Sequence, residues 1–317
     1  MKLVVQIPCL NEAETLPSVL ESIPRTIAGI DEIVVLVIDD GCTDRTVDVA
    51  REHGVSEFVH HARNQGLGRS FHDGVVRALE LGADIVVNTD GDNQYPQLRI
   101  RDLVQPIVRG EADIVIADRQ THLIEHFSGA KKKLQRFGSY VVNRAAGTEL
   151  PDAASGFRAY SRESLMVLNT ITRFSYCMET VIQAGNKRLR IDSIPIITNP
   201  KTRESRLFDS TPEHVLKSAA AIVRSFMMYR PYVLFLWLFA FFGLLGAIPF
   251  ARYGVLWFRD RQDGHVQSLL LGALLMILAF MSLMLGAISD LIRSNRVLIE
   301  VNLEHTKKAR FDRREVR

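Results

Sequence analysis

The sequence is poor in cysteine, in tryptophan and in net charge. Its three cysteines, Cys9, Cys42 and Cys177, lie far apart and have no metal-binding spacing, which indicates a reducing compartment and argues against a disulfide framework. A net charge of +3 over 317 residues gives no support to general nucleic-acid binding. The chain starts with an apolar strand pattern in place of a secretory signal, so we expect the main domain to stay in the cytosol.

A complete phosphate-loop signature is also missing. Gly66 and Gly68 form a glycine pair, but the Walker lysine pattern and the full dinucleotide fingerprint are absent. Taken alone, this pair is equally consistent with a turn that starts a helix.

Up to about residue 228, short apolar runs alternate with segments of helical spacing. This alternation predicts an α/β domain with a Rossmann-like, mostly parallel sheet and right-handed crossovers. The predicted strands span 3–7, 32–38, 58–60, 85–87, 113–117 and 190–198, and the segment 152–158 is expected to be a loop.

An acidic turn follows the fourth apolar run. Ile85 to Val87 is typical of a buried strand, and Asp90 and Asp92 come after it on either side of a glycine. Ligands of open α/β sheets bind beyond the carboxyl ends of the strands. Two carboxylates there suit a hard divalent cation that leaves positions open for phosphate oxygens, and Gln94 adds a neutral oxygen. An ordinary polar turn is the alternative.

Two further predicted strands end in polar loops, over Pro8 to Glu12 and Asp39 to Asp44. With the acidic turn they would lie at one edge of the sheet, which is where such folds bind nucleotides. Asn11 is predicted to be the N-cap of the helix that follows the first strand.

Basic residues become frequent after residue 119. Three lysines at 131–133 and Arg136 lie on a predicted helix, and a basic loop spans 200–206. A solvated helix face is the usual reading of such lysines, but the apolar segments that follow favour a surface facing a membrane or a phosphate. An amphipathic helix is predicted over 212–228.

Two apolar segments near the end of the chain, 232–250 and 268–288, contain no charged residue. About 20 helical residues cross a hydrocarbon core of roughly 30 Å, so we predict two transmembrane helices, at about 232–250 and 268–290. A buried hairpin of a soluble core is the alternative. Arginines before the first segment and many basic residues after the second place both flanks in the cytosol.

These patterns divide the chain into four parts. They are a soluble α/β domain over 1–210, an amphipathic interface helix over 211–230, a two-helix membrane region over 231–292 and a basic cytosolic tail over 293–317.

A membrane anchor on a nucleotide-binding domain points to a lipid acceptor, because a soluble substrate would not require one. In such a transfer a metal neutralises the departing diphosphate, and arginines hold the acceptor phosphate through their planar fork. A phosphate monoester is largely dianionic near neutral pH, so no strong general base is required.

The motifs, in this order, resemble those of the family-two glycosyltransferases with a GT-A fold. Within that family the chain is most similar to polyprenyl-phosphate glycosyltransferases of the dolichol-phosphate mannose synthase type. The matching stretches are 7–12, 39–44, 64–68, 90–96 and 152–158. The motifs cover about residues 3–210, whereas over 211–292 the resemblance is one of architecture only.

The resemblance implies a metal-dependent hexosyltransferase. It would move a sugar, with inversion, from a UDP- or GDP-sugar to a dolichyl or undecaprenyl phosphate at the cytosolic membrane face, with Mg²⁺ or Mn²⁺ as cofactor. The sugar, the nucleotide and the lipid stay open, and so does a homo-oligomeric state.

The resemblance also implies roles for individual residues. Contacts to the nucleotide are assigned to Pro8, Asn11, Glu12 and Asp39. The metal and the donor diphosphate are assigned to Asp90, Asp92 and Gln94. The acceptor phosphate is assigned to Arg119, Arg136 and Arg203, with Ser205 and Arg206 nearby. The expected catalytic residues are Asp92, Arg119 and Arg136.

The sequence departs from the family pattern at two places. Cys42 stands where the family usually has serine, and Ala117-Asp118-Arg119 replaces a turn that usually resembles Gly-Ser-Arg. The second departure keeps the arginine and adds a carboxylate near the expected acceptor.

Other functions compete with this prediction. A processive membrane polysaccharide synthase is disfavoured, because neither Trp237 nor Trp257 completes the Gln-x-x-Arg-Trp motif by which such enzymes resemble one another. A non-catalytic nucleotide-binding membrane partner is disfavoured by the intact acidic and arginine positions. A sugar-phosphate nucleotidylyltransferase would need an N-terminal glycine-rich signature that is absent.

Overall fold

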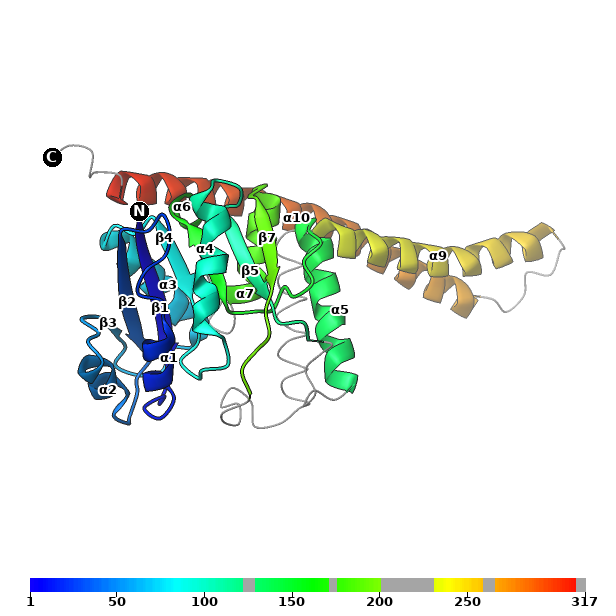
Figure 1. Cartoon of the computed structure of the whole chain (residues 1–317). Helices are drawn as coiled ribbons and strands as arrows, with labels where there is room; N and C mark the ends of the chain where they lie inside the picture. The colour runs from blue at the N-terminus through cyan, green and yellow to red at the C-terminus, as the bar shows by residue number, and fades with distance from the viewer. Residues whose placement is uncertain (122–128, 171–175, 201–230, 259–265, 312–317) are drawn as a thin grey trace. The chain divides into compact units, whose positions relative to one another are not determined.

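The computed structural model describes residues 1–121, 129–170, 176–200, 231–258 and 266–311 (Figure 1). The chain forms two compact units, one of residues 1–222 with 301–317 and the other of residues 223–300.

The first unit is built on a seven-stranded sheet in the order β3-β2-β1-β4-β6-β5-β7. All neighbouring strands are parallel except β6, which runs antiparallel to β4 and β5. The predicted α/β fold with a mostly parallel sheet is thereby confirmed. The strands are β1 (Lys2–Cys9), β2 (Glu32–Asp39), β3 (Glu57–His60), β4 (Ile85–Asn88), β5 (Ile114–Asp118), β6 (Arg158–Ser161) and β7 (Ile191–Pro195).

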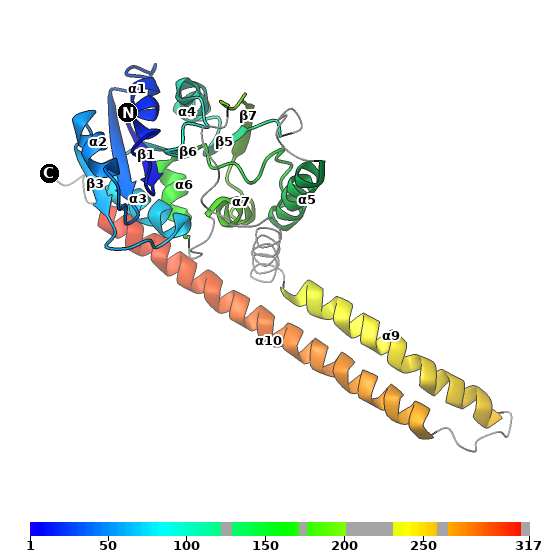
Figure 2. The same cartoon turned by 90° about the horizontal axis from the view of Figure 1, so that it is seen from below.

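Helices cover both faces of this sheet (Figure 2). Successive side chains of a strand point to opposite faces, so Leu3, Val5 and Ile7 of β1 join the apolar core cluster. Gln6 points the other way and touches Gly74. The helices are α1 (Leu16–Ser22), α2 (Thr46–Glu52), α3 (Leu67–Glu80), α4 (Ile100–Val108), α5 (Gly129–Ala146), α6 (Arg162–Val167) and α7 (Tyr176–Asn186).

The antiparallel strand β6 was not predicted from the sequence. It begins at Arg158, inside the motif expected to end a loop, and spans only four residues. A strand this short that starts with a charged residue shows no period-two pattern, although it is fully buried between β4 and β5. Its position in the sheet is therefore a consequence of tertiary packing.

The second unit is a hairpin of two long apolar helices, α9 (Pro231–Phe258) and the first part of α10 (Val266–Phe311). Gly246 and Gly272 let the helices approach closely, since a Cβ built on either would lie 3.2 Å from the carbonyl oxygen of the other. Of the most apolar stretch of 18 residues in each helix, only 6% is buried in α9 and 22% in α10. By length and composition, each helix could cross a membrane.

Both helices are longer than predicted. The helix α9 continues to Phe258, and α10 continues to Phe311 through most of the expected basic tail. Residues 293–311 contain neither proline nor glycine, and i,i+4 ion pairs join Arg296 to Glu300 and Glu304 to Lys308. Such pairs stabilise an exposed helix, which explains why the basic segment is helical.

The last turns of α10 belong to the first unit. Lys307 Nζ donates to the carbonyl oxygens of Leu165 at 3.2 Å and Leu168 at 2.5 Å. Arg310 forms an ion pair of 2.7 Å with Glu80 on α3. The Lys307 contacts satisfy carbonyl groups at the C-terminal end of α6, where a helix lacks partners of its own.

Candidate active site

The carboxyl ends of β1 and β2 lie side by side, with Cys9 opposite Asp39. Asn11 joins the loops that follow these strands, because its Oδ1 accepts hydrogen bonds from the backbone N–H of Thr43 (2.7 Å) and Asp44 (3.3 Å). The predicted N-cap role of Asn11 is wrong, since α1 begins at Leu16. The amide oxygen satisfies donors of the neighbouring loop instead.

Cys42 Sγ makes two hydrogen bonds, one as acceptor and one as donor, as a serine hydroxyl could. Its Sγ accepts from the backbone N–H of Asn11 at 3.3 Å, and its thiol donates to the carbonyl of Cys9 at 3.4 Å. Burial raises the pKa of this thiol to about 11. The sulfur is therefore a neutral link between the two loops.

Thr15 joins the same region to the acidic turn after β4. Its hydroxyl contacts the carbonyl oxygen of Gly91 at 2.7 Å and the carboxylate of Glu12 at 3.0 Å. A Cβ on Gly91 would come within 3.2 Å of Cys9 Sγ and Glu12 Cγ. The three polar loops predicted to share one edge of the sheet are therefore in direct contact.

Asp39 is held ionised at this edge. Its carboxylate accepts from the backbone N–H of Cys42 at 2.7 Å and pairs with Nδ1 of His60 at 2.9 Å. Burial alone would raise the pKa of Asp39, but these hydrogen bonds outweigh it and lower the pKa below its usual value.

Asp92 is restrained by Gln94, which was predicted to bind the same metal ion. The backbone N–H and the side-chain Nε2 of Gln94 donate to Asp92 at 3.1 and 2.8 Å. The amide nitrogen of Gln94 thus faces Asp92, and its role as an oxygen ligand stays a prediction.

The acidic turn fits a divalent cation by its chemistry. Asp90 and Asp92 supply hard oxygen ligands from one strand end, and Gly91 keeps the turn tight. Among the described residues, no group of three or more His, Cys, Asp or Glu side chains could hold a metal ion by itself. A cation at this turn would take its remaining ligands from substrate and water.

The loop 152–157 lies against Asp90. A Cβ on Gly156 would be 3.5 Å from Asp90 Oδ2 and 3.3 Å from the hydroxyl of Tyr176. The N–H of Gly156 donates to the hydroxyl of Tyr95 at 3.1 Å, while its carbonyl accepts from Tyr176 at 2.9 Å and Asn88 at 3.1 Å. Buried polar side chains thus hold the glycine close to the predicted metal ligand.

Arg158, for which the sequence predicted no role, holds the loop 152–157 in place from inside the domain. Its guanidinium is fully buried and donates to the carbonyl oxygens of Ala153 (2.9 Å), Ser155 (2.6 Å) and Cys177 (2.9 Å), and to the Thr180 hydroxyl (2.9 Å). It therefore determines the path of the loop 152–157. Its place in the Ser-Gly-Phe-Arg motif was the only signal in the sequence.

Arg119 and Asp152 form a two-pronged ion pair. Arg119 Nε lies 2.6 Å and Nη2 lies 3.0 Å from the two carboxylate oxygens, and only 1% of the Asp152 side chain is exposed. Burial would raise the pKa of Asp152, but the Arg119 guanidinium outweighs it and lowers the pKa. Asp152 thus orients the arginine that was predicted to bind the acceptor phosphate.

Arg136 lies on α5 and is exposed to solvent. It lines a pocket of about 380 Å³ together with Asp152, Asp118 and Tyr140. The fold therefore brings Arg136 close to the Arg119–Asp152 pair. Arg203, Ser205 and Arg206 lie outside the described residues, as does the predicted amphipathic helix over 211–230.

Residues 4–168, more than half of the chain, match the family profile described as glycosyl transferase family 2. The chain belongs to glycosyltransferase family 2. The resemblance inferred from the motifs is confirmed, and this glycosyltransferase has the GT-A fold implied by it.

Several relatives of this glycosyltransferase are named as enzymes that transfer a sugar to a polyprenyl phosphate. One is the UDP-N-acetylglucosamine–dolichyl-phosphate N-acetylglucosaminyltransferase of Methanococcus voltae, which is 28% identical over 213 residues, or 61% of this chain and 83% of that protein. Another is the undecaprenyl-phosphate mannosyltransferase of Micrococcus luteus, which is 28% identical over 206 residues, or 62% of this chain and 83% of that protein.

A solved structure supports the fold. Glucosyl-3-phosphoglycerate synthase from Mycobacterium tuberculosis, in complex with Mn²⁺, UDP-glucose and phosphoglyceric acid, superposes with a TM-score of 0.53. It is 24% identical and covers 70% of this chain and 79% of its own.

The ion pair predicts a specific stability defect. Asp152→Asn should lower the free energy of unfolding by about 3 kcal/mol or somewhat less, because it leaves the Arg119 charge unpaired, although Arg119 retains some contact with water. Since the pKa of Asp152 is lowered on folding, its contribution is complete at neutral pH. This contribution is lost as the pH falls from about 4, the ordinary pKa of an aspartate in the unfolded chain, to the lowered pKa of Asp152 in the folded protein.

Denaturant titration of the wild type and the variant at several pH values measures both effects. The matched control is Glu111→Gln, which removes an exposed partner of Arg109 and should leave stability nearly unchanged. An equal loss in both variants at neutral pH would contradict the prediction.

Proposed function

We propose that this glycosyltransferase moves a sugar, with inversion, from a nucleotide-sugar donor to a polyprenyl phosphate at the cytosolic face of a membrane. The observation that carries the proposal is the contact between the acidic turn and the two loops after β1 and β2. The loop 152–157 connects this turn to the pocket lined by Arg136. Sites suited to a donor and to an anionic acceptor are thus neighbours.

The donor nucleotide would bind at the ends of β1 and β2. Pro8, Asn11, Glu12 and Asp39 are the residues proposed to contact its base and ribose. Asp39 is ionised and held by two donors, so it would present a fixed acceptor to N–H or O–H groups of the nucleotide. Asn11 would keep the two loops at a constant spacing.

Asp90 and Asp92, with Gln94 as a third proposed ligand, would hold Mg²⁺ or Mn²⁺. Such a cation neutralises the charge that develops on the departing diphosphate. Gln94 restrains the Asp92 carboxylate through two hydrogen bonds, and Thr15 restrains Gly91 between the carboxylates. Glucosyl-3-phosphoglycerate synthase has been solved in complex with Mn²⁺ or Mg²⁺ together with UDP, which supports the same metals here.

The acceptor phosphate would bind beside Arg119 and Arg136. Asp152 directs Arg119, so the arginine fork would meet the phosphate in a defined orientation that aligns the acceptor oxygen for displacement. The relatives from Methanococcus voltae and Micrococcus luteus are named for dolichyl phosphate and undecaprenyl phosphate, which supports such an acceptor here. The helices α9 and α10 would hold the domain at the bilayer that contains this lipid.

Transfer should be seen directly in a labelling assay. Membranes that contain the protein would be incubated with radiolabelled UDP- and GDP-sugars and with dolichyl or undecaprenyl phosphate, and the labelled lipid extracted. EDTA should abolish transfer and Mg²⁺ or Mn²⁺ should restore it. Asp92→Asn should lower turnover by roughly 100-fold or more, because several kcal/mol of electrostatic stabilisation are lost.

The control is Asp84→Asn, which changes a carboxylate at the opposite end of β4 that binds the N–H of Lys2. It should keep full activity. Full activity in EDTA would contradict the metal assignment, and a labelled water-soluble product in place of a labelled lipid would contradict the acceptor.

Two cysteine substitutions test the topology. Gly264→Cys lies between α9 and α10, and Ala309→Cys lies on the exposed end of α10. A membrane-impermeant maleimide should label position 264 in intact cells, but position 309 only after permeabilisation. Equal labelling of both positions in intact cells would rule out the two-span arrangement.

Arg136 offers the cleanest test of the acceptor site, because it is exposed and can be truncated without leaving a buried charge. A hydrogen bond to a charged group contributes about 1.5–3 kcal/mol, so Arg136→Ala should weaken the apparent affinity for polyprenyl phosphate roughly 10- to 100-fold. Calorimetric binding of UDP or GDP with Mn²⁺ should barely change.

Arg144→Ala is the matched control, an exposed arginine two turns further along α5. For Arg119, Arg119→Lys keeps a charge beside Asp152 but removes the fork, and it should impair acceptor use more than nucleotide binding. If Arg136→Ala weakens nucleotide binding as much as acceptor use, the residue belongs to the donor site.

A further inference from the structure

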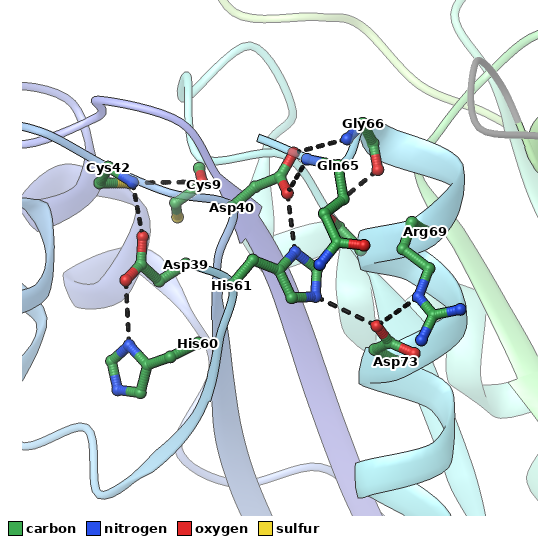
Figure 3. A network of polar contacts seen from close by, with 11 residues as sticks. Cys9, Asp39, Asp40, Cys42, His60, His61, Gln65, Gly66, Arg69 and Asp73 are labelled. Atoms are coloured by element: carbon green, nitrogen blue, oxygen red, sulfur yellow. Dashed lines mark hydrogen bonds and ion pairs between the residues drawn. The ribbon is translucent and has the colours of Figure 1, made fainter. Parts of the chain in front are cut away.

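Two consecutive histidines at the end of β3 face two consecutive aspartates at the end of β2 (Figure 3). The register places His60 opposite Asp39, and His61 Nδ1 lies 2.7 Å from Asp40 Oδ1. The His60–Asp39 pair belongs to the proposed donor site. The His61–Asp40 pair is buried, and neither residue has been given a role in the reaction.

Asp40 anchors the turn that starts α3. Its two carboxylate oxygens accept hydrogen bonds from the backbone N–H of Gln65 at 2.8 Å and of Gly66 at 3.0 Å. Gly66 has φ +91°, a conformation that favours glycine, and α3 begins at the next residue. The carboxylate thus determines the backbone position of this turn.

The anchored turn packs directly on the proposed donor loop. A Cβ on Gly41 would lie 2.7 Å from the backbone carbon of Arg63 and 2.7 Å from the nitrogen of Asn64. Gly41 stands between Asp40 and Cys42, and Cys42 donates to Asp39. Any shift of the turn 63–66 therefore presses on the loop that presents Asp39.

His61 fixes the orientation of Asp40. Only 4% of its side chain is exposed, and its second ring nitrogen, Nε2, lies 3.1 Å from Asp73 Oδ2. Asp73 also pairs with Arg69 at 2.7 Å, one turn earlier on α3. Because each ring nitrogen faces a carboxylate, the imidazole cannot rotate without losing a partner.

We propose that His61 is a positioning residue for donor binding. It holds Asp40, Asp40 holds the N–H groups of Gln65 and Gly66, and this turn supports the loop that carries Asp39. The proposal takes the nucleotide as the ligand from the proposed function.

Two amide substitutions separate the two contacts of the ring. In His61→Asn the amide nitrogen is as far from Cβ, in bonds, as Nδ1, so the contact with Asp40 can persist. In His61→Gln the amide nitrogen corresponds to Nε2, so the contact with Asp73 can persist while that with Asp40 is lost. Both variants remain polar, so neither places an apolar group beside the carboxylates.

Three measurements apply to each variant: calorimetric binding of UDP and of GDP with Mn²⁺, KM and kcat for the donor, and amide hydrogen exchange at residues 63–68. His61→Gln should weaken nucleotide binding and raise the donor KM roughly tenfold or more, with kcat nearly unchanged. It should also speed exchange at Gln65 and Gly66. His61→Asn should stay within a few fold of the wild type in all three.

His53→Leu is the control histidine, because its Nδ1 contacts the carbonyl oxygen of Val49 one turn earlier and its Nε2 lies 3.7 Å from Glu21, neither of which belongs to the proposed donor site. It should leave nucleotide binding unchanged. Equal nucleotide affinity in His61→Gln and the wild type would overturn the proposal, as would a defect of equal size in His61→Asn. If the wild type binds neither nucleotide, the donor assignment itself fails, and this is seen before any variant is compared.

Discussion

The buried guanidinium of Arg158 organises the loop 152–157, on which both the donor side and the acceptor side of the site depend. The Arg158 guanidinium has no exposed surface, and it donates to carbonyl oxygens of Ala153 and Ser155 within that loop. Taking a charged group out of water is unfavourable unless hydrogen bonds replace its hydration. The loop 152–157 therefore has to curl around the guanidinium, and the carbonyls that satisfy Arg158 cannot point elsewhere.

This loop reaches the donor side through Gly156 and the acceptor side through Asp152. Gly156 lies so close to Asp90 that a side chain there would contact the carboxylate, while Asp152 binds both nitrogens of the Arg119 fork. The spacing between the acidic turn and Arg119 is thus determined by one short segment. Such restraint suits a displacement in which two reactants must be aligned.

The elements of the sheet were largely predictable, because buried parallel strands are apolar runs and the polar loops after them must share an edge. The strand β6 was not, since Arg158 and three neighbours carry no strand pattern. The N-cap prediction for Asn11 failed because its side chain binds the neighbouring loop at Thr43 and Asp44. Partners distant in sequence leave no local signature.

Three features could be predicted from local pattern and hydrophobicity alone: the α/β fold, the positions of Asp90 and Asp92 at a strand end, and the two long apolar helices. Three contacts became visible only in the folded protein: Asp152 orients Arg119, Gln94 donates to Asp92, and His61 contacts Asp40. Apart from the Gln94 contact, these depend on segments that meet across the sheet. Their hydrogen-bond directions exist only once burial has removed water as the competing partner.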